Sequence, residues 1–170
     1  MTGELIDHIG ILVPDLEAAI EKWSRVLGYE FSPIGRYRSD TYVDNSDREP
    51  HFHDTRIAFS KQGPPYIELM SVTGEGTHSL AEAGVHHIAF KGIDHVPTRL
   101  AECAAFGVRE DGLSLVPDGS VHLAFTDKRD MDGIRLEFIA PFARALIADD
   151  GGPLWVDPAT GRTSLWCPPK

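Results

Sequence analysis

The chain has 170 residues, of which 42% are hydrophobic, and carries a formal net charge of -10 with a pI near 5.1. This length can bury one sizeable core or two small cores packed together. The acidic balance argues against nucleic acid and anionic membranes as partners, because both select for basic surfaces. No apolar run is long enough to span a bilayer, and the first residues lack the order of a secretory signal, so we expect a cytoplasmic protein. With only Cys103 and Cys167, the chain does not encode a disulfide framework.

The first half of the chain predicts a strand, a helix and three more strands. Asp15 is placed to cap the helix, whose apolar residues recur at helical spacing, and Gly28 is expected to end it. The polar stretch 39–50 has no apolar period and is predicted to be a long loop, the kind that often forms a lid. The strands are expected over residues 5–13, 29–38, 55–60 and 66–72.

The second half repeats this order after a glycine-rich, polar segment, 73–84, that we interpret as a linker. Its helix is expected to be capped by Asp94 and to end at Gly107. The tail from Pro141 onward has no strong period. The strands of this half are expected over residues 85–91, 108–115, 120–126 and 134–140.

Each half begins with a histidine inside an apolar strand and ends with a lone glutamate in another. In the first half these residues are His8 and Glu68. In the second half the glutamate is Glu137, and the histidine is either His86 or His87. Side chains alternate along a strand, so His86 and His87 are expected on opposite faces. Aligning the two halves selects His87 as the counterpart of His8 and matches His86 to Asp7.

These four residues predict one metal site on the strand faces turned away from the helices. A buried carboxylate is costly, and two close together repel each other, so Glu68 and Glu137 require a cation that neutral imidazoles cannot supply. Mixed imidazole and carboxylate ligands suit Zn, Ni, Co, Mn or Fe better than Ca or Mg. A single such histidine is usually a core residue and a single glutamate usually solvated, but four positions obeying one repeat favour metal binding. The predicted ligands are His8, Glu68, His87 and Glu137.

Other polar residues give weaker signals. His51 and His53 would share a face if they lay in a strand, but without carboxylates at a fixed offset a polar loop is favoured. Such a loop contacts the substrate only if it folds over the cleft. Arg36, Arg38 and Arg56 are able to bind an anionic substrate, although scattered arginines are usually solvated.

Four stretches resemble the vicinal oxygen chelate superfamily, which includes glyoxalase I, methylmalonyl-CoA epimerase, extradiol dioxygenases and the fosfomycin and bleomycin resistance proteins. The resemblance implies an α+β fold of two βαβββ modules that form a metal-containing cleft, with the four ligands on the first and last strand of each module. It predicts a single domain over 1–141, with modules at 4–73 and 84–141, followed by a C-terminal extension, 142–170. It also implies a homodimer. The stretches are Asp7-His8-Ile9-Gly10-Ile11 with Pro14-Asp15-Leu16-Glu17-Ala18-Ala19, Tyr66-Ile67-Glu68-Leu69, Gly84-Val85-His86-His87-Ile88-Ala89-Phe90, and Asp132-Gly133-Ile134-Arg135-Leu136-Glu137.

A ligand set with glutamate at position 68 is most similar to glyoxalase I or methylmalonyl-CoA epimerase. This implies a divalent-metal-dependent lyase or isomerase that transfers a proton α to a carbonyl through an enolate stabilised by the metal, with Glu137 as base and Glu68 assisting. The substrate would be a small carbonyl compound, such as a thioester or a glutathione adduct. The alternatives are an Fe(II) extradiol-type dioxygenase that uses His8, His87 and Glu137, and a binding or resistance protein without chemistry.

Several features depart from both enzymes. The third strand offers no carboxylate for an epimerase's second base, and the 39–54 insertion and the tail match neither pattern. The residues that contact the substrate are therefore not predicted.

Overall fold

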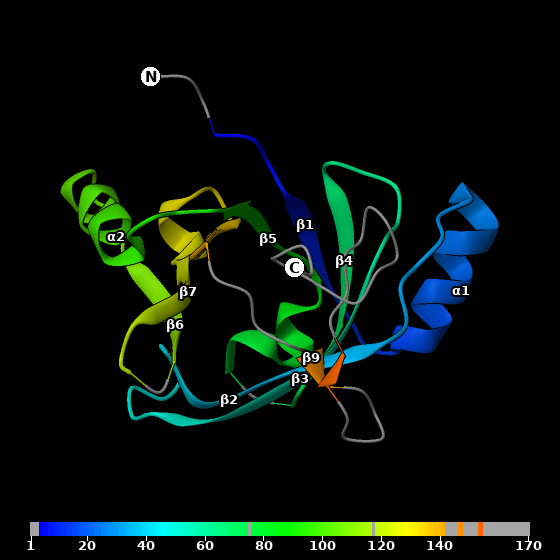
Figure 1. Ribbon diagram of the computed structural model, residues 1–170, viewed down its shortest axis with the longest axis horizontal. Helices are drawn as coiled ribbons and strands as arrows, with labels where there is room; N and C mark the ends of the chain where they lie inside the picture. Colours follow the sequence, from blue (N-terminus) through cyan, green and yellow to red (C-terminus); the bar gives the residue numbers. More distant parts are fainter. Residues whose placement is uncertain (1–3, 75, 117, 142–145, 148–152, 155–170) are drawn as a thin grey trace.

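The structure, a computed structural model, describes residues 4–74, 76–116 and 118–141, and the backbone of 146–147 and 153–154. A strand, a helix and three strands occur twice, which confirms the paired βαβββ modules (Figure 1). The first module contains β1 (His8–Val13), α1 (Leu16–Leu27), β2 (Gly35–Asp44), β3 (His51–Phe59) and β4 (Tyr66–Ser71). The second contains β5 (Gly84–Lys91), α2 (Val96–Ala105), β6 (Glu110–Leu115), β7 (Val121–Thr126) and β8 (Arg135–Ile139).

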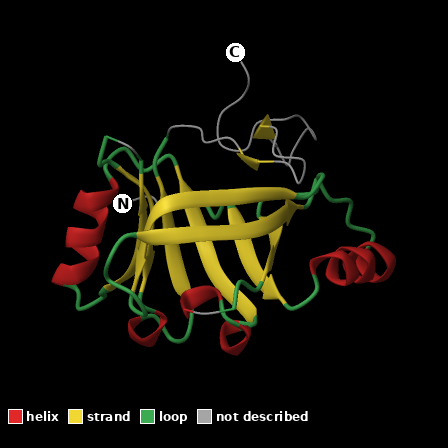
Figure 2. Ribbon diagram, turned by 90° about the horizontal axis from the view of Figure 1, so that it is seen from below, coloured by secondary structure: helices red, strands yellow, loops and turns green. Residues whose placement is uncertain are grey.

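The strands form one continuous sheet that closes on itself. Its order is β10-β9-β2-β3-β4-β1-β5-β8-β7-β6, in which β9 is Leu146–Ile147 and β10 is Pro153–Leu154. The two modules meet where β1 pairs antiparallel with β5. A further antiparallel pairing of β2 with the edge strand β6 closes the sheet, at Tyr42 with Ser114 and Asp44 with Gly112. Figure 2 shows the resulting barrel with the two α-helices on opposite sides, outside the sheet. The sheet thus encloses its inner face instead of leaving it open.

The predicted helix boundaries are confirmed at three of four ends. Asp15 caps α1, with its side chain accepting a hydrogen bond from the Ala18 amide at 2.9 Å, and Gly28 ends it with a left-handed φ of 73°. Gly107 follows α2 as expected, also at positive φ. The prediction that Asp94 caps α2 is wrong, because the neighbouring His95 accepts the hydrogen bond from the Thr98 amide at 3.1 Å.

Apolar residues divide into two outer layers and one inner core. Leu16 of α1 packs on Ile67 and Leu69 of β4, while Val96 of α2 packs on Phe138 of β8. These contacts confirm that the neighbours of Glu68 and Glu137 face the helices. The interior of the barrel is filled by a third cluster of buried side chains: Leu12, Tyr37, Tyr42, Ile57, Phe59, Tyr66, Met70, Ala89, Leu123, Phe125 and Ile139.

The first half of the predicted long loop over 39–50 is strand. β2 continues to Asp44, so the second strand lies later in the chain than the expected 29–38. β3 begins at His51, so the third strand is longer than the expected 55–60, and only 45–50 connects the two. Some of the polar side chains that suggested a loop are buried and make hydrogen bonds inside the barrel. Ser39, for example, is buried and accepts a hydrogen bond from Ser114 across the β2–β6 seam at 2.9 Å. Polar content alone therefore did not identify these strands.

The segment predicted to link the modules is partly ordered as two short 3-10 helices, Gly76–His78 and Leu80–Glu82. In the tail, β9 (Leu146–Ile147) pairs with β2 at Arg36, and β10 (Pro153–Leu154) pairs with β9. The rest of the predicted extension, with Cys167, lies outside the described residues, and the division into 1–141 and 142–170 stays a prediction.

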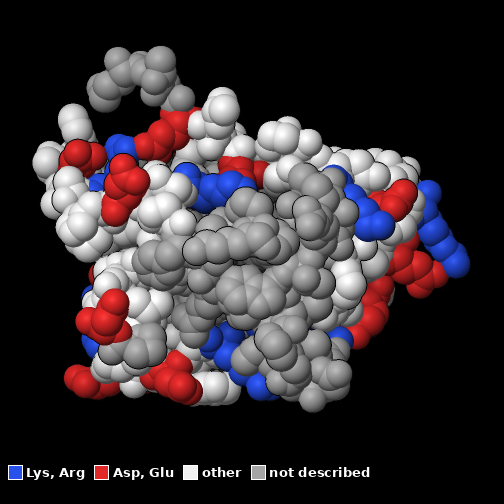
Figure 3. All heavy atoms as spheres, viewed as in Figure 1, with Lys and Arg blue, Asp and Glu red and all other residues white. Residues whose placement is uncertain are grey.

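The described helices are all too short or too polar to cross a membrane. On the face drawn in Figure 3, acidic and basic side chains of the described residues are interspersed, and these residues form no continuous basic area there.

Candidate metal centre

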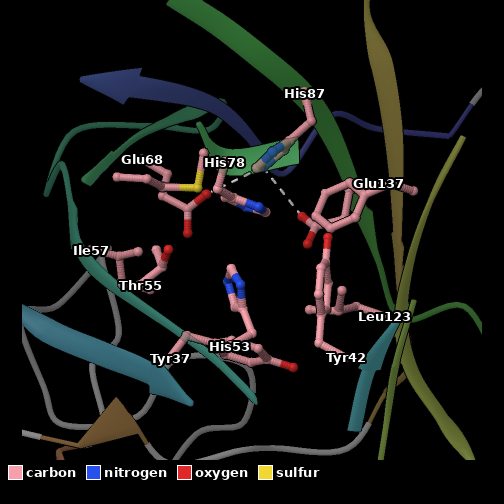
Figure 4. A pocket seen from close by; sticks show the side chains of 12 residues that line it. Tyr37, Tyr42, His53, Thr55, Ile57, Glu68, His78, His87, Leu123 and Glu137 are labelled. Atoms are coloured by element: carbon pink, nitrogen blue, oxygen red, sulfur yellow. Dashed lines mark ion pairs between the residues drawn. The ribbon is translucent and has the colours of Figure 1, made fainter. Parts of the chain in front are cut away.

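The four residues predicted as ligands come from four neighbouring strands. Their order in the sheet, β4-β1-β5-β8, places Glu68, His8, His87 and Glu137 side by side on the inner face. All four side chains are buried. They belong to a single chain, so the cluster forms without a partner subunit. Figure 4 shows Glu68, His87 and Glu137 directed into the same space inside the barrel.

The distances within the cluster are those of ligands around one ion. The Nε2 atoms of His8 and His87 lie 3.2 Å apart. Glu137 Oε2 lies 3.2 Å from the first and 3.4 Å from the second, and Glu68 Oε2 lies 3.5 and 3.2 Å from them. Ligand atoms bound tetrahedrally at about 2.0–2.2 Å are separated by about 3.3–3.6 Å. His8, His87 and Glu137 form the tighter group, with ligand atoms all within 4.8 Å of one another.

The electrostatics of the cluster also call for a cation. Burial lowers the pKa of His8, but the charge of Glu68, the hydrogen bond with Asp7 and the charge of Glu137 outweigh burial and raise this pKa to about 10. Glu137 Oε2 is buried and accepts no hydrogen bond of good geometry from a described residue. An ionised oxygen in such a place is costly unless positive charge compensates it. The residues present therefore fit a divalent ion.

Asp7 orients His8. Its Oδ2 lies 2.9 Å from His8 Nδ1, and its Oδ1 pairs with Lys91 Nζ at 2.7 Å. Since a carboxylate accepts, the Nδ1 proton of His8 points to Asp7, and Nε2 can present its lone pair to a metal ion that displaces its proton. Metal-binding histidines commonly have such a partner.

His86 has the equivalent position beside His87. Its Nε2 lies 2.8 Å from the Thr77 carbonyl oxygen, which can only accept, so His86 Nε2 carries the proton. The Nδ1 atoms of His86 and His87 lie 2.9 Å apart, and His87 must then be the donor. His87 Nε2 is thereby left free to face the cluster. The alignment of His86 with Asp7, read from the repeat, corresponds to the same hydrogen-bonding role.

The prediction that His86 and His87 face opposite sides is wrong. Between β1 and β5 the register shifts, with Gly10 opposite His87 and Ile11 opposite Val85, so His86 is the extra residue of a β-bulge. Both imidazoles are consequently buried, at 0% and 1% exposure. Simple alternation cannot represent an inserted residue, which is why the sequence argument failed here.

Gly10 is a functional position that the sequence analysis missed. A Cβ atom built on Gly10 would lie 2.1 Å from His87 Cε1 and 2.4 Å from its Nε2. Only glycine lets the β1 backbone pass this close to the imidazole. The signal available in the sequence was a glycine inside the first predicted strand, two residues after the predicted ligand His8.

A cavity of about 30 Å³ adjoins the cluster inside the barrel. Its apolar walls include Ile57, Met70, Leu123 and Phe125, and its polar wall includes Thr55, whose buried Oγ1 has no hydrogen-bond partner among the described residues (Figure 4). It is also lined by Tyr37, Tyr42, His53, Glu68, His78, His87 and Glu137. The enclosure is consistent with chemistry shielded from water.

His53 lies in β3 and lines this cavity, so the prediction of a polar loop at 51–53 is wrong. Its ring stacks on Tyr42 at 4.5 Å between centroids and lies 4.6 Å from the ring of His78. Burial, and to a lesser degree the charge of His51, lowers the pKa of His53 to about 4. The imidazole is therefore neutral at neutral pH.

The arginines considered as anion binders have other partners. Arg36 and Arg38 both pair with Asp54 at 3.0 Å, and Arg56 pairs with Glu17 at 2.7 Å. Paired arginines of this kind crosslink neighbouring elements and have less charge to offer a ligand.

The comparisons with known proteins agree with the geometry. A family model described as the Glyoxalase/Bleomycin resistance protein/Dioxygenase superfamily matches residues 7–112. No curated protein matches the chain. Among solved structures, a hypothetical protein from Bacillus halodurans C-125 has the same fold, with 22% identity over 85% of this chain and 99% of its own and a TM-score of 0.59.

Two solved methylmalonyl-CoA epimerases are also similar. A variant of the Streptomyces coelicolor enzyme in complex with 2-nitronate-propionyl-CoA is 27% identical, with a TM-score of 0.54 and coverage of 81% of this chain and 94% of that chain. A methylmalonyl-CoA epimerase in complex with methylmalonyl-CoA and NH4+ is 25% identical, with the same TM-score and coverage. The family model spans more than half of the chain and the fold agrees with it, so the chain belongs to the glyoxalase/bleomycin resistance protein/dioxygenase superfamily, as the vicinal oxygen chelate motifs indicated.

Proposed function

We propose that this protein is a divalent-metal-dependent isomerase or lyase that moves a proton on the carbon next to a carbonyl group. The observation that carries the proposal is the convergence of two imidazole Nε2 atoms and two buried carboxylates on one point beside a small cavity. His8, Glu68, His87 and Glu137 are the proposed ligands. The similarity to methylmalonyl-CoA epimerases supports isomerisation rather than a reaction of another class.

Zn, Ni, Co, Mn or Fe suits this donor set, and when bound it would supply Lewis-acid stabilisation of negative charge on the carbonyl oxygen. Glu137 is the proposed base. Its Oε2 accepts no hydrogen bond of good geometry from a described residue, and Glu137 lines the cavity where the substrate carbon would lie. It takes the proton from carbon, and the electron pair of the C–H bond becomes that of the enolate. Glu68 lines the same cavity and is placed to assist.

The test combines metal analysis of the purified protein with solvent exchange. The metal-loaded protein in D2O should incorporate deuterium next to the carbonyl of small hydroxyketones or thioesters, as seen by proton NMR. Glu137→Gln should slow this exchange by about 10²–10⁴-fold, because it removes the base and one charged ligand. Glu21→Gln, an exposed carboxylate on α1, is the matched control and should have no effect. Absence of exchange in every metal-loaded sample would overturn the proposal.

The tighter group of His8, His87 and Glu137 favours one second candidate. Two histidines and one carboxylate with open positions are the ligands of non-haem Fe(II) oxygenases. In that case Glu68→Ala would keep its iron, and the iron-loaded protein would consume oxygen with catechols. An isomerase should instead lose metal affinity with Glu68→Ala and show no oxygen uptake.

A further inference from the structure

A second hollow lies next to the inner cavity and opens at the barrel end where β2 turns into β3. Its volume is about 360 Å³. We call it the outer basin; its lining residues are Asp44, Ser46, Asp47, His51, Phe52, His53, Asp54, Thr73, Gly76 and His78. His53 and His78 line both the basin and the inner cavity, so the two spaces adjoin at these residues.

His53, where the two spaces adjoin, offers a polar group to a ligand. His53 is nine-tenths buried, and its ring makes contacts with other rings but no hydrogen bond to a described residue. In Figure 4 this ring projects into the centre of the cavity. A buried, neutral imidazole without a hydrogen-bond partner favours a ligand with a polar group at this point.

The described residues that line the basin include three aspartates, Asp44, Asp47 and Asp54. Asp54 is neutralised by Arg36 and Arg38. No described lysine or arginine lies within salt-bridge distance of Asp44, although its charge also acts on Arg48 from farther away. Burial raises the pKa of Asp44, but hydrogen bonds from Ser46 and Thr77 hold it below the usual range, so it is ionised. Asp47 is half-exposed, and its only described ionic neighbour is His51 at 3.8 Å. Among the described residues that line the basin there is no lysine or arginine.

We propose that the outer basin holds the distal part of the substrate and selects a compact chelating carbonyl compound, such as a hydroxyketone, whose distal end is uncharged or cationic. The inference deepens the proposed function and rests on it for the position of the reacting end. It disfavours thioesters of CoA and other anionic adducts, because their phosphates or carboxylates would lie beside Asp44 and Asp47.

Three probes that share one hydroxymethyl ketone and differ in distal charge test this selection. They are dihydroxyacetone, dihydroxyacetone phosphate and 1-hydroxy-3-(trimethylammonio)propan-2-one. Deuterium incorporation at the hydroxymethyl carbon gives kcat/KM for the zinc-loaded protein, and calorimetry gives the affinity of each probe. At low salt we expect the kcat/KM and the affinity of the cationic probe to exceed those of the phosphate ester about tenfold or more. Both differences should shrink at about 1 M salt.

Asp47→Asn isolates the contribution of the basin, since a central metal attracts the phosphate equally in every variant. The substitution keeps an oxygen for the hydrogen bond from the Glu49 amide and removes one charge. We expect Asp47→Asn to reduce the preference for the cationic probe over the phosphate ester several-fold. Glu21→Gln on the outer helix should leave this preference unchanged.

The outcomes separate the two proposals. Exchange with the phosphate ester as fast as with the cation, or an unchanged ratio in Asp47→Asn, would overturn the charge selection and leave the proton-transfer function standing. If no probe exchanges but the cation still binds more tightly than the phosphate ester, the function fails and the binding preference of the basin stands.

Discussion

At the scale of single residues, the site depends on where two protons lie. Asp7 accepts the Nδ1 proton of His8, and His86 accepts that of His87, so each ring presents Nε2 to the centre. Asp7 is a charged acceptor. His86 is a neutral one, because its Nε2–H donates a hydrogen bond to the Thr77 carbonyl and its Nδ1 is left to accept. The two halves of the chain thus solve the same orientation problem with different side chains.

His86→Phe should weaken metal binding about 10–100-fold, since it removes the acceptor that fixes the tautomer of His87. His86→Gln should recover most of the affinity, because an amide can accept from His87 and donate to Thr77 with one side chain. Competition with a chromophoric chelator measures both. A merely structural role would lower the unfolding free energy of the metal-free protein equally in both variants and leave zinc affinity at the wild-type value.

Gly10→Ala should displace the ring of His87, because the added methyl would overlap it and the surrounding core is filled. We expect loss of stoichiometric metal and a decrease in unfolding free energy of about 1–3 kcal/mol. Metal analysis and urea denaturation check the two parts. A variant that retains wild-type zinc affinity would show that the ring tolerates the methyl group.

At the scale of elements, strand pairing explains both the successes and the failures of the sequence patterns. The alternation of apolar residues correctly placed Ile67 and Phe138 on the helix faces. It failed in β5, where a bulge turns two successive histidines inward, and in β2 and β3, whose polar residues face a hydrogen-bonded interior. Pairing partners distant in the chain, such as Ser39 and Ser114, decide whether such residues can be buried.

The β2–β3 hairpin should be sensitive to acid through Asp54. Burial raises the pKa of Asp54, but hydrogen bonds and charge from Arg36 and Arg38 outweigh it, so the pKa lies below its usual value of 3.8. A depressed carboxyl pKa contributes stability that is present above about pH 4 and is lost as the pH falls further. Asp54→Asn should therefore cost about 1 kcal/mol at pH 7, a value reduced for solvent screening, and less toward pH 2. Denaturation at both pH values tests this, and a cost independent of pH would contradict the ion pairs.

At the scale of the whole molecule, the closed barrel would couple binding of the proposed metal to folding. The four proposed ligands come from four strands and both modules, so they converge only when the modules are joined. Zinc at about 100 times its dissociation constant should then stabilise the native state by about 2.7 kcal/mol. For a chain of this size the expected rise in Tm is about 5–10 °C. Calorimetry with and without a chelator measures it, and His87→Ala should abolish most of the shift; an equal shift in that variant would place the ion elsewhere.

The sequence by itself determined the repeat, the class of fold and the four residues that meet at the centre. It could do so because buried strands and helices carry regular apolar patterns, and because two half-chains with matching polar exceptions constrain each other. Only the tertiary structure decided that His86 turns inward beside His87, that the cavity adjoins an acidic basin at His53 and His78, and that β2 and β6 close the barrel. Those features arise from register shifts and from contacts between residues distant in the chain, whose energies no local pattern contains.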